Sequence, residues 1–235
     1  MRHRWDQLTF LHWSYDPEVV QSLLPPGLAM EPYEGRAWVG LVPFLMEVRS
    51  QRGRALRWPF RFPETNVRTY VTGPGGQPGV WFFSLDATRL GAVPTARGTY
   101  RVRYFWSDMA VTRSGSTMEY SSRRRWPGPR DACSRVVVEI GDEHRPEELS
   151  PFDHYLTARW TMFGTWGRQL LMARAQHPSW PLHRATADWN GDLVAAAGLP
   201  APEGDPIVHW SPGVDVLIGY PHRVPVVREI VRTGG

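Results

Sequence analysis

The chain has 235 residues and a formal net charge of +4, and its 27 basic residues are all arginines. Because a guanidinium stays protonated and cannot form an imine, the absence of lysine excludes Schiff-base chemistry on a side-chain amine. A single cysteine, Cys133, excludes an intramolecular disulfide and a cysteine-based metal site. The composition, with 42% hydrophobic residues, 12 tryptophans and 22 residues each of Gly and Pro, is typical of a globular chain with many turns and more sheet than helix.

Short strands and a few short helices are predicted along the chain. Helices are expected after the capping residues Asp16, Asp86 and Ser150, each near a proline or an apolar stripe, and over 186–197, where Gly198 follows. The residues 160–176 are ambiguous and favour strand. The remaining predicted strands are 8–13, 28–33, 36–48, 64–72, 80–86, 100–112, 117–126, 133–140, 207–211 and 214–220. The pattern predicts an α+β fold that is mainly antiparallel β, with three or four short peripheral helices.

The predicted strand 64–72 carries the most informative pattern. Its alternation places Glu64, Asn66, Arg68 and Tyr70 on one face. If this face points inward, Arg68 can hold a carboxylate, and Glu64 can move a proton once burial raises its pKa. The alternative is a wet outer face of an antiparallel sheet, which has the same pattern. The residues alone leave these two interpretations open.

Other polar groups have simpler interpretations. Ser84 and Asp86 are expected on one face of a strand beside Phe82, and no Gly-x-Ser-x-Gly motif supports a nucleophilic serine. The eight histidines are scattered without metal-ligand spacing, and we predict no metal. His12 is expected to be a hydrogen-bonded core histidine. The run 123–125 is basic enough to contact phosphates, but it lies where a strand meets a Pro/Gly loop, so a solvated face is the favoured interpretation.

Several segments in order along the chain resemble the bacterial YqjF-like family, a domain of unknown function. The likeness covers nearly the whole chain. The segments are Phe10–Trp13, Leu24–Leu28, Gly35–Phe44, Glu64–Val71, Gly79–Asp86, His177–Pro178, Trp180–Leu182 and Ser211–Val216.

More remotely, the chain is similar to the acetoacetate decarboxylase-like superfamily. This resemblance implies an antiparallel β-cone or barrel around a ligand cavity, with Glu64 near a pocket glutamate and Arg97 near a pocket arginine. The stretch 100–104 matches the place of the decarboxylase lysines, yet it reads Tyr-Arg-Val-Arg-Tyr. The chain therefore departs from the decarboxylase at the residue that forms the Schiff base.

We therefore expect a small-molecule cavity protein, with enzymatic acid/base chemistry on a small carboxylate or carbonyl compound that needs neither lysine nor a cofactor. The expected catalytic residues are Glu64 and Tyr104. The expected ligand-binding residues are Asn66, Arg68, Tyr70, Arg97 and Arg103. The alternatives are a non-catalytic binder of an apolar small molecule and, less favoured, a nucleic-acid-binding module.

The organisation expected is one domain over 1–220 and a tail over 221–235. No run has the apolar length of a membrane span or of a signal peptide, so we expect a cytoplasmic protein without a membrane partner. No nucleic-acid partner is expected. A small-molecule ligand is expected, and a homo-oligomer is compatible with the sequence.

Overall fold

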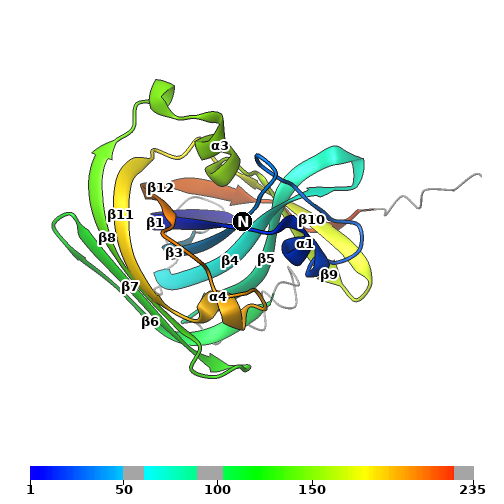
Figure 1. Cartoon of the computed structure of the whole chain (residues 1–235), viewed down its shortest axis with the longest axis horizontal. Coiled ribbons are helices and arrows are strands. Elements are labelled where there is room, and N and C mark those ends of the chain that lie inside the picture. The colour runs from blue at the N-terminus through cyan, green and yellow to red at the C-terminus, as the bar shows by residue number, and fades with distance from the viewer. Residues whose placement is uncertain (50–60, 89–102, 225–235) are drawn as a thin grey trace, which may run out of the picture.

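The computed structural model describes residues 1–49, 61–88 and 103–224. Within these ranges the chain is mainly antiparallel β with few helices, as predicted (Figure 1). The strands are β1 (Arg2–Tyr15), β2 (Ala29–Met30), β3 (Ala37–Arg49), β4 (Arg61–Gly73), β5 (Gln77–Ala87), β6 (Tyr104–Ser114), β7 (Thr117–Trp126), β8 (Cys133–Glu143), β9 (Thr161–Trp166), β10 (Gln169–Gln176), β11 (His183–Gly191), β12 (Ile207–Ile218) and β13 (His222–Arg223). The helices are α1 (Pro17–Ser22), α3 (Pro151–Thr157) and α4 (Leu193–Ala196), with 3-10 turns η1 (Pro74–Gly76) and η2 (Pro146–Glu148).

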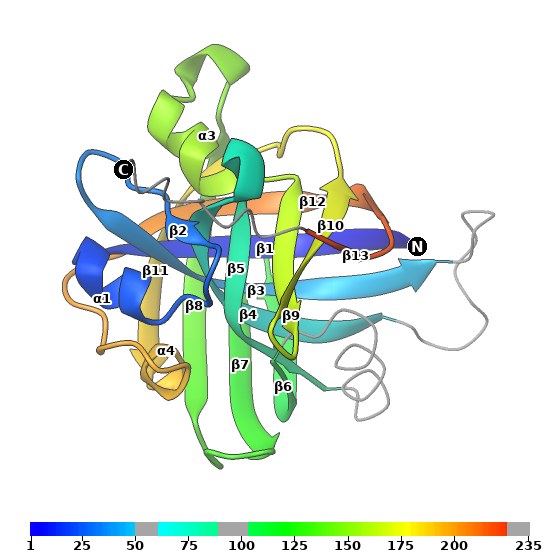
Figure 2. The same ribbon diagram turned by 90° about the vertical axis from the view of Figure 1, so that its right-hand side faces the viewer.

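The pairings between neighbouring strands form two closed circuits, and each circuit is one route of strand pairing that starts and ends at β5. From β5, neighbouring ladders lead through β6, β7, β8, β11, β12, β1, β3 and β4, and β4 pairs again with β5. A second route leaves β5 through β9 and β10 and reaches β12 directly. The strands β12, β1, β3, β4 and β5 are common to both routes. In Figure 2 the strands β1, β3 and β4 run across the molecule, and β6, β7 and β8 cross them.

The shared strands are packed on both faces, so few of their residues reach solvent. On one face, Leu11 and Val67 join a core with Met118 of β7 and Val136 of β8. On the other face, side chains of β4 and β5 pack against α3, which Figure 1 shows above β1 and β12, and side chains of β1 join a separate cluster with Trp180. A strand buried on both faces cannot be assigned an inner and an outer side from polarity alone.

Two of the predicted helix starts are confirmed by the structure. Asp16 caps α1, and its side chain accepts from the Glu18 amide at 2.8 Å. Ser150 caps α3 in a reciprocal capping box with Asp153. Among the described residues, no helix is long and apolar enough to cross a membrane.

The helix predicted over 186–197 is wrong in its first half. Residues 183–191 form β11, which pairs with β8, and only Leu193–Ala196 are helical. Ala185, Ala187 and Trp189 alternate with exposed neighbours, which is a strand pattern, and they pack against the core. Their alanines favour a helix locally, but tertiary pairing decides the outcome. As predicted, Gly198 follows the helical turn, with φ of +104°.

The expected neighbourhood of Phe82, Ser84 and Asp86 also needs correction. A bulge in β5 changes the register with β4, so that Phe82 pairs with Arg68 whereas Ser84 pairs with Val67. Phe82 therefore lies on the opposite face from Ser84 and Asp86. The helix expected after Asp86 falls mostly on residues 89–97, which lie outside the described residues.

Candidate functional site

The polar face of β4 is buried. Glu64, Asn66, Arg68 and Tyr70 are 2%, 5%, 8% and 0% exposed. The interpretation of this face as a wet outer surface is therefore wrong. Buried polar groups are costly unless they find partners, so the partners of these four side chains indicate what the face does.

A glycine on the neighbouring strand β3 makes room for a histidine ring beside this face. Arg68 lies opposite Gly40 of β3 in the ladder. A Cβ atom at Gly40 would stand 2.9 Å from Nε2 of His12, so only glycine leaves space for the imidazole here. His12 is 0% exposed and hydrogen-bonded, as predicted for a core histidine.

Glu64 and Tyr104 meet although they are distant in the sequence. The Tyr104 hydroxyl donates to Oε2 of Glu64 at 2.8 Å. Burial raises the pKa of Glu64 from 4.5 to about 8, although the Tyr104 hydrogen bond acts in the opposite direction and the Asp86 carboxylate adds to the rise. A carboxyl group with such a pKa is largely protonated at neutral pH and can exchange a proton near it.

Arg68 and Tyr70 share a different partner, the carbonyl oxygen of Leu156 in α3. Nη2 of Arg68 donates to this oxygen at 3.2 Å, and the Tyr70 hydroxyl donates to it as well. Nε2 of His12 lies 2.6 Å from the Tyr70 oxygen. Because the Tyr70 proton is used on Leu156, His12 donates here and its Nδ1 carries a lone pair. Burial, followed by the charge of Arg68, keeps the pKa of His12 well below its usual value.

Three polar atoms of this face have no hydrogen-bond partner within the described ranges. They are Oδ1 of Asn66, Nε of Arg68 and Nδ1 of His12. All three belong to buried side chains. Unpaired buried polar atoms point to a bound water or ligand, because native proteins rarely leave such atoms unsatisfied. The face thus offers both acceptors and a cationic donor to a small oxygenated molecule.

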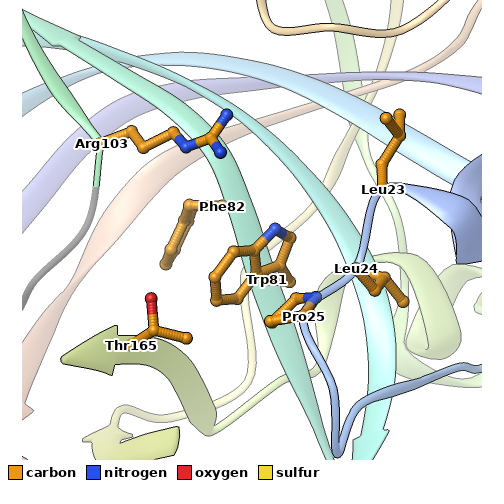
Figure 3. A pocket seen from close by; sticks show the side chains of 7 residues that line it. All are labelled: Leu23, Leu24, Pro25, Trp81, Phe82, Arg103 and Thr165. Atoms are coloured by element: carbon orange, nitrogen blue, oxygen red, sulfur yellow. The ribbon is translucent and has the colours of Figure 1, made fainter. Parts of the chain in front are cut away.

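A cavity of about 190 Å³ opens at the edge of β5 (Figure 3). It is lined by residues 23–25 after α1, by Trp81 and Phe82 of β5, by Thr165 of β9 and by Arg103. The guanidinium of Arg103 extends over Trp81 and Phe82 in Figure 3, with Leu23 on the far side of the cavity. Phe82 connects the cavity to the polar face, since its partner across the ladder is Arg68.

The site residues predicted from the sequence lie in two places, the polar face of β4 and the adjoining cavity, and one of them cannot be placed. Glu64 and Tyr104 meet at the polar face, where Asn66, Arg68 and Tyr70 also lie, and Arg103 lines the adjoining cavity. Arg97 lies outside the described residues. The role of the Leu156 carbonyl was not predicted, because no sequence signal identifies a backbone acceptor contributed by a distant helix.

The arginine run 123–125 is occupied by carboxylates. Arg124 is completely buried and pairs with Asp86 at 2.7 Å. Arg125 pairs with Asp108 at 2.6 Å, and Arg123 lies 3.8 Å from Asp131. These ion pairs leave little free charge for phosphates. In the described part of the chain, no group of three or more His, Cys, Asp or Glu residues is placed to hold a metal ion.

Comparisons with known proteins agree on the fold. The chain is 32% identical over 219 residues to the uncharacterized protein YqjF of Bacillus subtilis (strain 168), which covers 92% of this chain and 89% of that protein. Its structure is similar to that of the enduracididine biosynthesis enzyme MppR complexed with pyruvate, with a TM-score of 0.67 and 14% identity over 96% of this chain and 90% of that chain.

A second solved structure supports the same fold. The acetoacetate decarboxylase of Legionella pneumophila matches with a TM-score of 0.64 and 16% identity, over 96% of this chain and 88% of that chain. Identities this low show a common fold alone. The model of the DUF2071 family, described as uncharacterized conserved protein, matches residues 2–215. The chain therefore belongs to the DUF2071 family of uncharacterized proteins and has an acetoacetate decarboxylase-like fold.

Proposed function

We propose that this protein binds a small carbonyl or carboxylate compound at the polar face of β4 and moves a proton on it through Glu64. The observation that carries the proposal is the buried Glu64–Tyr104 pair, in which the pKa of the carboxyl group is raised to about 8. Groups with strongly shifted pKa values that lie beside unsatisfied polar atoms are typical of functional sites. We place the ligand inside the closed circuit of strand ladders to which β4 belongs.

The chemistry assigned to each residue follows from its geometry. Protonated Glu64 donates to a ligand oxygen, and its carboxylate form takes a proton from the carbon beside a carbonyl group. Tyr104, whose hydroxyl is bonded to Glu64, orients the carboxyl group and stabilises its charged form. Asn66 and Nε of Arg68 hold the remaining oxygen atoms. The Tyr70 hydroxyl, already bonded to Leu156 and His12, positions Arg68 instead of binding the ligand.

The proposed mechanism contains no covalent intermediate with an amine. Both decarboxylase-like neighbours share the fold, but this chain has no lysine anywhere. Pyruvate, which accompanies MppR in its structure, is a reasonable first ligand because it carries both a carboxylate and a carbonyl group. The reaction class we propose is acid/base catalysis on such a compound, including proton exchange, hydration and lyase reactions.

The direct test is deuterium exchange at C3, the carbon beside the keto group, of pyruvate and larger 2-keto acids in D2O, followed by proton NMR. The wild-type protein should accelerate the exchange, and Glu64→Gln should reduce the enzyme-dependent rate to background. Tyr104→Phe should slow it by less than Glu64→Gln does, because Tyr104 orients the carboxyl group, whereas the group that transfers the proton contributes about 100- to 10,000-fold. Glu147→Gln, which removes an exposed surface carboxylate, is the matched control. Full exchange in Glu64→Gln would contradict the proposal.

The alternative function is a non-catalytic binder of an apolar small molecule. Five of the seven residues that line the cavity beside β5 are apolar, which favours it. It predicts that no keto acid undergoes exchange, while apolar compounds raise the melting temperature of both wild type and Glu64→Gln equally. A ligand present at about 100 times its Kd adds about 2.7 kcal/mol of stability, which a thermal-shift assay detects.

A further inference from the structure

The strands around β5 separate at one point, and the cavity lies there. One edge of β5 pairs with β4 along its length. On its other edge, Val80 and Trp81 pair with β9, whereas residues 85–87 pair with β6. Among the described strands, Phe82 and Ser84 have a ladder partner only on the β4 edge, and Phe83, at the bulge between them, has no ladder partner. The cavity occupies this fork, with Thr165 of β9 on one side and Arg103, which precedes β6, on the other.

The walls of the cavity have two kinds of chemistry. Residues 23–25, Trp81 and Phe82 form an apolar wall, and Leu23 remains 39% exposed although it is a large aliphatic residue. Arg103 supplies a cation at the rim (Figure 3). Within the described ranges Arg103 forms no ion pair, in contrast to Arg125, which binds Asp108 at 2.6 Å. An apolar wall beside a guanidinium that has no ion-pair partner in the described part of the chain matches a molecule with a negative group and an apolar tail.

We infer that this fork binds a monocarboxylate with a medium-length or aromatic apolar tail, with its carboxylate on Arg103 and its tail against Leu23, Pro25, Trp81 and Phe82. The size of the tail follows from the volume of about 190 Å³. An apolar cavity of about 150 Å³ accommodates benzene. The fork therefore takes a phenyl ring or a chain of about six carbons. The inference rests on the proposed function in one respect: the monocarboxylate bound here is taken to be the class of compound on which the adjoining polar face acts.

Isothermal titration calorimetry with butanoate, hexanoate, octanoate and octanamide tests this inference. These compounds have no keto group, so their binding is independent of proton transfer by Glu64. Affinity should rise about fourfold with each methylene group that is buried, and it should level off between hexanoate and octanoate as the cavity fills. Octanamide, which has the tail without the charge, should bind at least tenfold more weakly than octanoate.

Two variants separate the two walls. Arg103→Gln should lower the affinity for octanoate at least tenfold and leave that for octanamide unchanged, whereas Arg130→Gln, which removes another exposed arginine, should change neither. Leu23→Gln should lower the affinity for octanoate more than the affinity for butanoate. Equal affinity of wild type and Arg103→Gln for octanoate, or affinity independent of chain length, would overturn the inference. Glu64→Gln should bind hexanoate with the affinity of wild type although it exchanges no protons. This result would support the binding site independently of the proposed catalysis.

Discussion

Glu64 shows how one buried residue makes stability depend on pH. Its pKa is raised from 4.5 to about 8 mainly by burial. The folded state therefore keeps a proton that the unfolded state loses between these two values, and the free energy of unfolding falls as the pH rises through this window. Glu64→Gln removes the dependence. The variant should become more stable than wild type as the pH increases from 5 to 8, by a margin on the order of a few kcal/mol, with no further gain above pH 9.

Urea denaturation at pH 5, 6, 7, 8 and 9 measures this difference. Glu147→Gln, at an exposed position, is the control for the loss of a carboxyl group. A constant difference between Glu64→Gln and wild type across the series would show that Glu64 titrates normally in the folded protein.

For single residues, the sequence predicted which side chains carry the chemistry but not which groups they contact in the fold. The alternation of residues 64–70 correctly placed four polar side chains on one face, and the structure shows that this face is buried. The distance between Glu64 and Tyr104 could not be predicted, because it depends on β5 pairing in parallel with β6. The partner of Tyr70 is a backbone carbonyl of α3, to which no side-chain pattern points.

Among the elements, β7 demonstrates how alternation assigns different roles to adjacent arginines. Arg124 points inward, stacks on Phe105 with 3.6 Å from Cζ to the ring centroid, and makes two hydrogen bonds to Asp86. Arg125 points outward to Asp108, with its side chain 43% exposed. Breaking a buried pair leaves a charge without compensation, whereas a surface pair contributes little.

Arg124→Met should therefore lower the free energy of unfolding by about 3–5 kcal/mol, and Arg125→Met by less than about 1 kcal/mol. Chemical denaturation of both variants provides the comparison. The double variant Asp86→Leu/Arg124→Met should recover much of the loss, because it removes both charges. Equal small losses in the two single variants would mean that the Asp86 pair is solvated.

The docking of α3 depends on hydrogen bonds to its last carbonyl groups. Tyr70 and Arg68 bind the carbonyl of Leu156, and Nε1 of Trp180 donates to that of Thr157 at 3.0 Å. Tyr70→Phe leaves the His12 donor without its acceptor, at a cost of about 1–3 kcal/mol. Amide hydrogen exchange over 151–158 should become faster in this variant. Tyr33→Phe is the control, because the Tyr33 ring also stacks on Phe152 of α3 but its hydroxyl makes no hydrogen bond within the described residues.

For the whole molecule, the sequence predicted the class of the fold better than its closure. Strands with many turns indicated a mainly antiparallel sheet, and the family resemblance indicated the decarboxylase-like arrangement that the structural comparisons support. The pairing of β1 with β12 joins residues about 200 positions apart, as in Arg2 with Leu217. No local pattern encodes such a pairing. The same reasoning explains the error over 186–191, where a long-range ladder to β8 overrides helix-forming alanines.

The junction of β1 and β12 also decides how the molecule should unfold. Both routes of strand pairing pass through this ladder. At Gly213 of β12 the φ angle is +110°, and a Cβ atom would stand 2.1 Å from the carbonyl oxygen of Trp5. Gly213→Ala must therefore separate the two strands as well as strain the backbone. Since this ladder is common to both routes, the damage should affect the whole molecule and not a single hairpin.

We expect Gly213→Ala to unfold in one cooperative transition with a melting temperature lower by at least about 5 °C, because each kcal/mol lost shifts the midpoint by about 2–4 °C in a domain of this size. Differential scanning calorimetry measures both the midpoint and the number of transitions. Gly219→Ala is the control, since its added Cβ would lie at an ordinary 3.6 Å from the carbonyl oxygen of Arg174. Two separate transitions in Gly213→Ala would mean that the two routes of strand pairing fold independently, because then only the strands on one side of β12 depend on this ladder.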